Sequence, residues 1–232
     1  MSPHFTALDD SPARERALAA TIAARLAAAI ELRGRASLVV SGGRTPVGVF
    51  DLLSRQPLDW HAVTITLADE RWVAPTHEDS NEHLVRSHLL RREAAAARFV
   101  PLKTAAATPE EGVAQAAAAL SEIARPFDVV VLGMGSDGHT ASLFPEASEL
   151  PAALDPEAPL PCIAVRPPRA PYPRMTLTLR ALLEARAILV EIAGADKRGV
   201  IERALLPGDE AEMPIRAVLR QRKVPVDIFW SP

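Results

Sequence analysis

The chain has 232 residues, of which 48% are apolar and 24% are charged. These proportions are ordinary for a globular protein, and they exclude a disordered, a collagen-like or a coiled-coil chain. The 26 basic and 29 acidic residues give a net charge of −3. This charge argues against broad nucleic-acid binding, which requires a basic surface.

The cysteine content and the N-terminus indicate the compartment in which the protein works. Cys162 is the only cysteine and cannot form an internal disulfide, which is typical of a reducing compartment. The first residues lack the basic-then-apolar pattern of a signal peptide. The longest apolar segment, 17–30, is mostly alanine and is interrupted by Arg25, so no stretch would span a bilayer. The sequence therefore predicts a soluble, cytoplasmic protein.

Helix and strand patterns alternate along the chain. Pro12 near the start of the first helix and Gly34 after its end are typical helix boundaries. The predicted helices cover residues 11–32, 46–53, 83–92, 109–124, 195–205 and 215–220. The predicted strands cover residues 36–40, 63–67, 99–102, 127–132, 162–165, 175–179, 188–192 and 226–230. Several of these strands are wholly apolar, as expected for strands that are covered on both faces.

This alternation predicts an α/β fold with a mostly parallel sheet and helices on both faces. We expect a single domain over residues 1–232, in which the proline-rich segment 145–173 forms an ordered excursion. In parallel sheets of this kind, ligands bind beyond the carboxyl ends of the strands. Candidate sites are therefore expected in the loops that follow strands.

The first unusual loop is the segment 41–46 (SGGRTP), after the strand predicted at 36–40. Gly42 and Gly43 would let the backbone approach a ligand closely and adopt positive φ. Thr45 is expected to cap the next helix, whose free N–H groups would then form an anion site. A tight, ligand-free turn is the alternative. The segment is no Walker loop, because no Lys-Ser or Lys-Thr follows the glycines.

The second loop is the segment 68–73 (ADERWV), directly after the strand predicted at 63–67. Asp69 could orient a hydroxyl group, and Arg71 could stabilise negative charge that develops on an oxygen. A surface salt bridge is the alternative interpretation, and the sequence alone does not decide between the two.

The third loop is the segment 133–140, which formally matches G-x-G-x-x-G. A dinucleotide site would also need a helix that opens inside the motif and a later strand ending in an acidic residue. A proline-rich segment follows instead, so the loop is interpreted through His139, which lies two residues after Asp137. Histidine on such a loop suits acid–base catalysis near neutral pH. Asp137 would either fix the tautomer of this histidine or contact the substrate.

Two further cations suit an anionic ligand. Arg174 comes directly before the strand predicted at 175–179, and Lys197 lies in the first turn of the helix predicted at 195–205. A lysine at a helix N-terminus is unfavourable to the helix dipole. Only three of the 26 basic residues are lysines, so its presence there favours a ligand explanation.

Other chemistries find little support. The remaining histidines lack an H-E-x-x-H motif or cysteine partners, so no metal site is predicted. Cys162 is expected to be a small buried residue rather than a nucleophile. Ser41 and Ser142 lack a G-x-S-x-G setting, which argues against a serine hydrolase.

Together these loops resemble the 6-phosphogluconolactonase family. The matching segments are 41–46 (SGGRTP), 69–73 (DERWV), 80–81 (SN), 133–145 (GMGSDGHTASLFP), 174–178 (RMTLT) and 194–197 (GADK), in the order of the family. The resemblance implies a Rossmann-like α/β fold, shared with glucosamine-6-phosphate deaminase and ribose-5-phosphate isomerase. It also implies hydrolysis of 6-phospho-D-glucono-1,5-lactone to 6-phosphogluconate in the oxidative pentose phosphate pathway, without a metal or organic cofactor.

The resemblance further implies roles for individual residues. His139 would be the general base, and Asp69, Arg71 and Asp137 would line the sugar ring. The phosphate would be held by Ser41, Gly42, Gly43, Arg174 and Lys197. His139 would take a proton from the water that attacks the lactone carbonyl and return it to the ring oxygen. Arg71 or backbone N–H groups would stabilise the oxyanion.

Two positions depart from the pattern of the family. Arg44 stands where many relatives carry serine, which brings an additional cation near the expected phosphate. Ser136 stands where an acidic residue is common. Neither departure removes an expected catalytic group, but both could tune the choice of substrate. The expected partner is a phosphorylated sugar lactone, with no nucleic acid or membrane, and the protein is expected to be a monomer or a small homo-oligomer.

Two alternatives remain on the same scaffold, which are a sugar-phosphate isomerase or deaminase and a non-catalytic sugar-phosphate sensor. The related deaminases carry a glutamate about five residues after the histidine, where this chain has Phe144, which cannot transfer a proton. A non-catalytic sugar-phosphate sensor would be expected beside a helix-turn-helix segment. This chain begins directly with its first α/β helix and shows no basic recognition helix, so the hydrolase is favoured.

Overall fold

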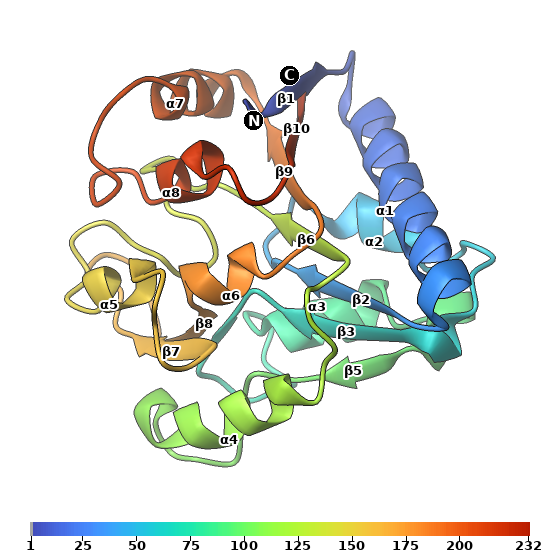
Figure 1. Ribbon diagram of the computed structural model, residues 1–232, viewed down its shortest axis with the longest axis horizontal. Helices are drawn as coiled ribbons and strands as arrows, with labels where there is room; N and C mark the ends of the chain where they lie inside the picture. Colours follow the sequence, from blue (N-terminus) through green and yellow to red (C-terminus); the bar gives the residue numbers. More distant parts are fainter. Residues whose placement is uncertain (1) are drawn as a thin grey trace.

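A seven-stranded parallel sheet forms the centre of the computed structural model, which describes residues 2–232 (Figure 1). In spatial order its strands are β1 (His4–Ala7), β10 (Val226–Ser231), β9 (Ile188–Ala193), β6 (Val129–Leu132), β2 (Ala36–Val40), β3 (Val63–Leu67) and β5 (Arg98–Val100). All positions of β2 and β6 are buried, which explains why their sequences are apolar apart from Ser37.

Helices cover both faces of this sheet. The helices within the described residues are α1 (Ser11–Arg33), α2 (Val47–Leu53), α3 (Asn81–His88), α4 (Pro109–Ser121), α5 (Leu150–Leu154), α6 (Leu179–Leu183), α7 (Ala195–Leu205) and α8 (Ile215–Arg220), with short 3₁₀ helices at Trp60–Ala62 and Arg92–Ala96. Figure 1 shows α1 and α2 on one side of the sheet and α6, α7 and α8 on the other. The predicted α/β fold with a mostly parallel sheet and helices on both faces is therefore confirmed.

The order of the strands creates a position for a site. From β2 the chain continues to β3 and β5 on one side, and it then returns to β6 on the other side of β2. In an open parallel sheet, such a reversal leaves a crevice at the carboxyl ends of the two central strands, and ligands bind there. The crevice between β2 and β6 is thus the place where the fold favours a ligand.

A second, three-stranded antiparallel sheet was not predicted from the sequence. It consists of β4 (Asp69–Arg71), β8 (Arg174–Leu177) and β7 (Cys162–Val165), in that order. The centre of the segment 68–73, which was expected to be a loop, is therefore a short strand. Arg174, expected just before a strand, is the first residue of β8 and pairs with Arg71 in the antiparallel register.

Several predicted boundaries were also wrong. The edge strand β1 was missed, because its four residues are only half-buried and show no apolar run. By contrast, α1 begins at Ser11 as predicted, and Asp10 caps it by accepting a hydrogen bond from the Ala13 N–H at 2.7 Å. The helix expected at 83–92 is α3, which begins two residues earlier and ends at His88. The proline-rich segment contains the short helix α5 in addition to the predicted strand.

Two searches of the described residues found no candidates. None of the helices within residues 2–232 has the length and apolar character that a membrane crossing requires. Over the same residues, no three His, Cys, Asp or Glu side chains gather closely enough to hold a metal ion.

Candidate functional site

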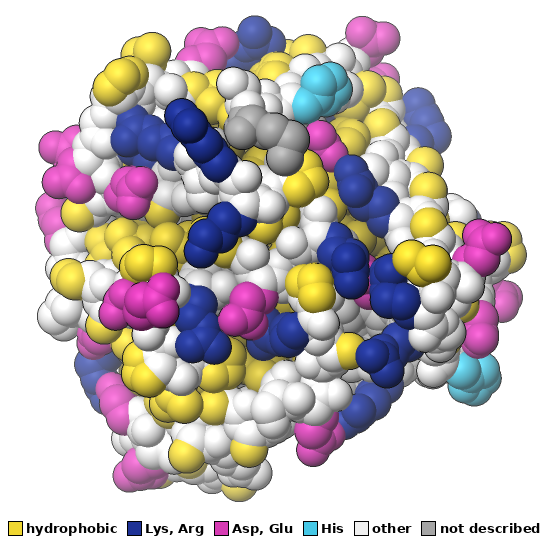
Figure 2. Space-filling model, in the orientation of Figure 1, with side chains coloured by type: hydrophobic (Ala, Val, Ile, Leu, Met, Phe, Trp, Pro, Cys, Tyr) yellow, Lys and Arg dark blue, Asp and Glu magenta, His cyan; other side chains and the backbone are white. Residues whose placement is uncertain are grey.

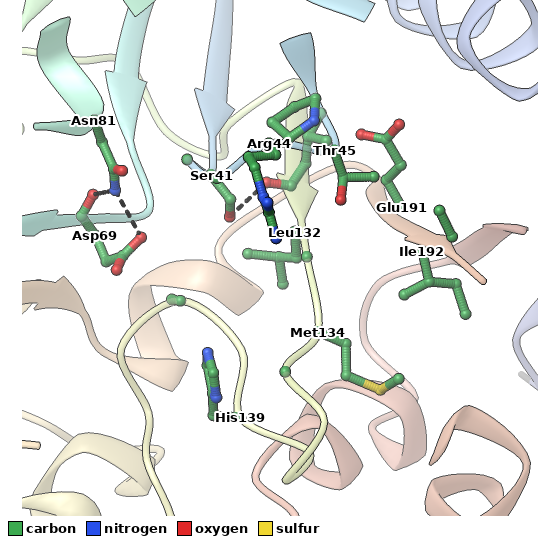
Figure 3. Close-up of a pocket in the computed structure, with 18 of the residues that line it drawn as sticks. Ser41, Arg44, Thr45, Asp69, Asn81, Leu132, Met134, His139, Glu191 and Ile192 are labelled. Carbon is green, nitrogen blue, oxygen red and sulfur yellow. Dashed lines mark hydrogen bonds between the residues drawn. The ribbon is translucent and has the colours of Figure 1, made fainter. Parts of the chain in front are cut away.

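A cavity of about 300 Å³ opens at the carboxyl ends of β2, β6 and β9 (Figure 3). Its walls come from the loops after β2 and β6, from β4 and β8 of the small sheet, and from the first turns of α3 and α7. The predicted site residues that line it are Ser41, Gly42, Gly43, Arg44, Asp69, Arg71, His139, Arg174 and Lys197. The fold thus brings together residues from five separate segments of the chain.

A second hollow, of about 220 Å³, lies at the opposite end of the strands, where β2, β3 and β6 begin. Figure 2 shows basic side chains on the right of the view, where β2 and β3 begin in Figure 1. The arginines that line this hollow are Arg33, Arg35, Arg98, Arg125 and Arg186. Four of them form ion pairs with carboxylates of the chain itself, which are Asp128, Glu122 and Glu184. We therefore place the candidate site in the cavity at the carboxyl ends of the strands.

His139 and Asp137 form a hydrogen-bonded pair in the loop after β6. Nδ1 of the imidazole lies 2.6 Å from Oδ1 of Asp137, and the same oxygen accepts a bond from the His139 backbone N–H at 3.1 Å. Gly135 leaves room for this pair, because a Cβ at that position would lie 2.1 Å from Nδ1. With Nδ1 held by the carboxylate, Nε2 is the ring nitrogen available for proton transfer.

Asp137 itself does not line the cavity, although the resemblance placed it at the sugar ring. It lies behind the imidazole, which corresponds to the tautomer-fixing alternative. Partial burial acts to raise the pKa of Asp137, but the hydrogen bonds from the His139 ring and backbone outweigh it and lower the pKa to about 2. Asp137 therefore stays ionised and keeps the imidazole oriented at any pH near neutrality.

This depressed pKa predicts a pH-dependent stability difference. Asp137→Asn should lower the melting temperature at pH 7, and the difference from the wild type should shrink as the pH falls from about 4 to about 2. The folded-state pKa of about 2 lies below the ordinary value of 3.8, so the stabilisation is present above pH 4 and is lost on protonation. Thermal unfolding between pH 2 and pH 7 measures it. Asp9→Asn, at an exposed position, is the control, and a constant difference over the whole range would contradict the assignment.

Strand β4 explains the roles of the three consecutive charged residues. Side chains alternate along a strand, and Asp69 and Arg71 line the cavity while Glu70 points away from it toward α3. The carboxylate of Glu70 accepts bonds at 2.7 Å from the N–H groups of Arg71, Asn81 and Glu82. Burial raises the pKa of Glu70, and these N–H groups act against the rise. Glu70 therefore fixes the N-terminus of α3 to the site.

The two arginines of the small sheet lie opposite each other on β4 and β8. Arg71 donates to the carbonyl of Asp79 at 2.6 Å, and Arg174 lies 3.7 Å from the carboxylate of Asp69. Each retains a buried Nε–H without a partner among residues 2–232. Because like charges directly opposite each other destabilise a sheet, this pair favours a site that receives negative charge.

The loop after β2 differs from its predicted geometry. Thr45 does not cap α2, because the cap position is Pro46 and no side chain bonds to the helix N-terminus. Gly43 has the expected positive φ of 99°, whereas Gly42 is needed for space, since a Cβ there would lie 1.8 Å from Oδ1 of Asn81. The hydroxyl of Ser41 donates to the carbonyl of Val131 at 3.1 Å, so its proton is already used within the fold.

Positive charge exceeds negative charge in the cavity. Its cations are Arg44, Arg71, Arg174 and Lys197, and its anions are Asp69 and Glu191. Arg44 and Lys197 make no ion pair with any residue in 2–232, and Figure 3 shows the Arg44 side chain extending into the space between its loop and His139. The helices α2 and α7 also begin at the cavity without a capping side chain. This arrangement favours a small dianion.

Two cavity residues were missed by the sequence analysis. Asn81, the first residue of α3, donates from Nδ2 to the backbone carbonyl of Asp69 at 2.8 Å and to its carboxylate at 3.3 Å (Figure 3). Glu191 of β9 accepts a bond from Arg14 at 3.0 Å, and burial raises its pKa to about 7 against the effect of that arginine. The segment 80–81 (SN) was among those that match the family, which was the available signal for Asn81. Glu191 lies in an apolar strand and gave none.

The comparisons with known proteins agree with this geometry. A sequence model of the family described as glucosamine-6-phosphate isomerases/6-phosphogluconolactonase matches residues 9–230. A 6-phosphogluconolactonase of Rhizobium meliloti (strain 1021) is 48% identical over 232 residues, which are 100% of each chain. One of Pseudomonas aeruginosa is 48% identical over 217 residues, which are 94% of this chain and 90% of that relative. The crystal structure of a 6-phosphogluconolactonase from Shewanella baltica OS155 superposes with a TM-score of 0.97 at 50% identity, and the match covers 99% of this chain and 98% of that one.

Proposed function

The chain belongs to the glucosamine-6-phosphate isomerase/6-phosphogluconolactonase family, and we propose that it hydrolyses 6-phospho-D-glucono-1,5-lactone to 6-phosphogluconate in the oxidative pentose phosphate pathway. The observation that carries this proposal is the cavity itself. It places a carboxylate-oriented imidazole on one wall and the two unpaired cations Arg44 and Lys197 among its other lining residues. A phosphorylated sugar lactone has the matching parts, which are an electrophilic carbonyl and a dianionic phosphate.

The phosphate is assigned to the positive side of the cavity. Lys197 and Arg174 supply side-chain cations, and the uncapped helix α2 offers backbone N–H groups after Gly42 and Gly43. Ser41 contributes through its backbone, because its hydroxyl proton is bonded to Val131. Arg44 adds a further cation at the same loop.

The reaction follows from the orientation of His139. Nε2 takes a proton from a water molecule as the water oxygen forms a bond to the lactone carbonyl carbon. The developing oxyanion accepts hydrogen bonds from Arg71, whose buried Nε–H has no partner within residues 2–232. The bond from this carbon to the ring oxygen then breaks, and the imidazolium returns its proton to the departing ring oxygen. The product is the open-chain acid, and Asp69 is placed to accept a bond from a ring hydroxyl.

The residue five positions after His139 argues against the deaminase alternative. Phe144 occupies this position, and its ring centroid lies 4.4 Å from that of the imidazole at an interplanar angle of 39°. A phenyl ring supports the imidazole by packing, but it cannot transfer the proton that ring opening of an amino sugar requires. The contact therefore favours hydrolysis, in which His139 acts without a second acid.

The proposal is tested with freshly formed lactone, made in place from glucose 6-phosphate and followed by detecting 6-phosphogluconate with its dehydrogenase. The wild type should open the lactone well above the no-enzyme rate. Lys197→Ala should raise KM about 10–100-fold with little change in kcat, because a charge-assisted contact to the phosphate is lost. Lys223→Ala, at an exposed lysine, should match the wild type. A wild type no faster than the blank would overturn the proposal, and an unchanged KM in Lys197→Ala would overturn the phosphate assignment.

A further inference from the structure

The loop that carries His139 is tied to the carboxylate of Asp69 by a buried serine. Ser142 is 0% exposed, and its hydroxyl donates to Oδ2 of Asp69 at 2.5 Å. Such a short bond to a carboxylate belongs to the strong, charge-assisted class. Nothing in the reaction described above uses Ser142, and it does not line the cavity.

The local backbone directs this hydroxyl inward. Residues 140–143 form a tight turn in which the Leu143 N–H donates to the Thr140 carbonyl at 2.9 Å. Ala141, within the turn, adopts a φ of 49°, a conformation that is uncommon for a residue with a side chain. The Ser142 N–H donates to Oγ1 of Thr176 at 3.2 Å. The turn is therefore fixed at both the backbone and the side chain of Ser142.

The carboxylate of Asp69 is contacted by side chains from three different parts of the chain. Asn81 of α3 bonds Oδ1 at 3.3 Å, Ser142 bonds Oδ2, and Arg174 of β8 lies 3.7 Å from Oδ2. Of these partners, only Ser142 belongs to the loop of His139, three residues further along the chain. The Ser142 hydroxyl thus links the loop of His139 directly to the Asp69 carboxylate.

We propose that Ser142 is a positioning residue that holds the Asp69 carboxylate in register with His139, so that the lactone carbonyl and the attacking water meet correctly. This inference rests on the proposed lactone hydrolysis. Ser142 acts through Asp69 and touches no reacting atom. If Ser142 acts only through Asp69, the two substitutions should not be additive, because removing the serine should lower activity little once Asp69 has been replaced.

A double-mutant cycle on kcat/KM for the lactone measures this dependence. Ser142→Ala and Asp69→Asn should each lower kcat/KM about 10–100-fold. The double variant should be no more than about threefold worse than Asp69→Asn alone. Ser142→Ala should also alter the same parameter, kcat or KM, that Asp69→Asn alters. Ser142→Cys, which keeps a weak donor of similar shape, should recover part of the loss and also completes the cycle if the alanine variant does not fold.

The chain offers a matched control at the amino ends of the central strands, away from the cavity. Ser37 is also buried and lies 3.3 Å from a carboxylate oxygen of the buried Asp128. Ser37→Ala should lower the melting temperature but leave kcat/KM unchanged. Fully multiplicative losses in the Ser142 and Asp69 cycle, or a Ser142→Ala protein with wild-type kcat/KM, would overturn the positioning role alone. An inactive wild type would overturn the proposed function and this inference with it.

Discussion

Replacing His139 with alanine should lower kcat about 10²–10⁴-fold and change KM little. The imidazole is held by Asp137 at 2.6 Å and packs against Phe144, so it is already oriented before the substrate binds. Its loss removes the proposed proton acceptor, while the cations that we assign to the phosphate remain. Equal losses in kcat and kcat/KM would place the effect in the transition state rather than in binding.

The assay must separate this loss from the spontaneous opening of the lactone. Initial rates are therefore measured against a no-enzyme blank at each substrate concentration, with folding checked by circular dichroism. His61→Ala, at an exposed histidine of the Trp60–Ala62 helix, should retain the wild-type rate. A His139→Ala protein that keeps more than about a tenth of the wild-type kcat, well outside the range typical of general-base loss, would remove the imidazole from the proposed role.

The largest effect on stability is expected at Glu70. Glu70→Gln should lower the free energy of unfolding by about 2–4 kcal/mol, because one of its two acceptor oxygens becomes an amide that faces buried donors. The glutamate receives hydrogen bonds from three backbone N–H groups and from the Ser80 hydroxyl at 3.1 Å. Left without an acceptor, such donors are costly to bury. For a chain of this size the melting temperature should fall by about 4–16 °C.

Urea unfolding and thermal unfolding at pH 7 measure this change. Glu78→Gln is the matched control, since Glu78 lies on the exposed segment just before α3 and the same chemical change there should have little effect. If both variants unfold at the same urea concentration as the wild type, Glu70 does not fix α3. A loss of stability confined to Glu70→Gln supports the structural role of the Glu70 carboxylate.

Apolar sequence patterns were sufficient to predict most of the large sheet. Strands such as β2 and β6 are buried on both faces, so their sequences are apolar apart from Ser37, and such strands can be recognised without knowing their neighbours in the sheet. β4 was missed because its three residues are all charged. Each face of this short strand meets polar partners, the cavity on one side and α3 on the other, and no apolar periodicity arises.

The candidate site could be predicted as a set of residues but not as a geometry. In parallel sheets ligands bind beyond the carboxyl ends of the strands, and this rule predicted that the loops of Ser41 and His139 lie at the same end of the sheet. The charged segment at Asp69 was included because it follows a predicted strand. The partners of these residues could not be deduced, because they depend on contacts between distant segments. The sequence left open whether Asp137 faces the imidazole or the substrate, and it gave no sign that Gly42 makes room for Asn81.

The final strand of the described chain has a consequence for synthesis on the ribosome. β10 inserts between β1 and β9, so the N-terminal strand has no neighbour in the sheet until β10 has emerged. Trp230 and Ser231 also bond to the backbone of Gly194, where α7 begins, both at 2.9 Å. The start of α7, which carries Lys197, therefore receives these bonds only after β10 has been synthesised. A nascent chain that stops short of β10 would carry His139 without them, so the lysine that we propose for phosphate binding would be secured later than the imidazole.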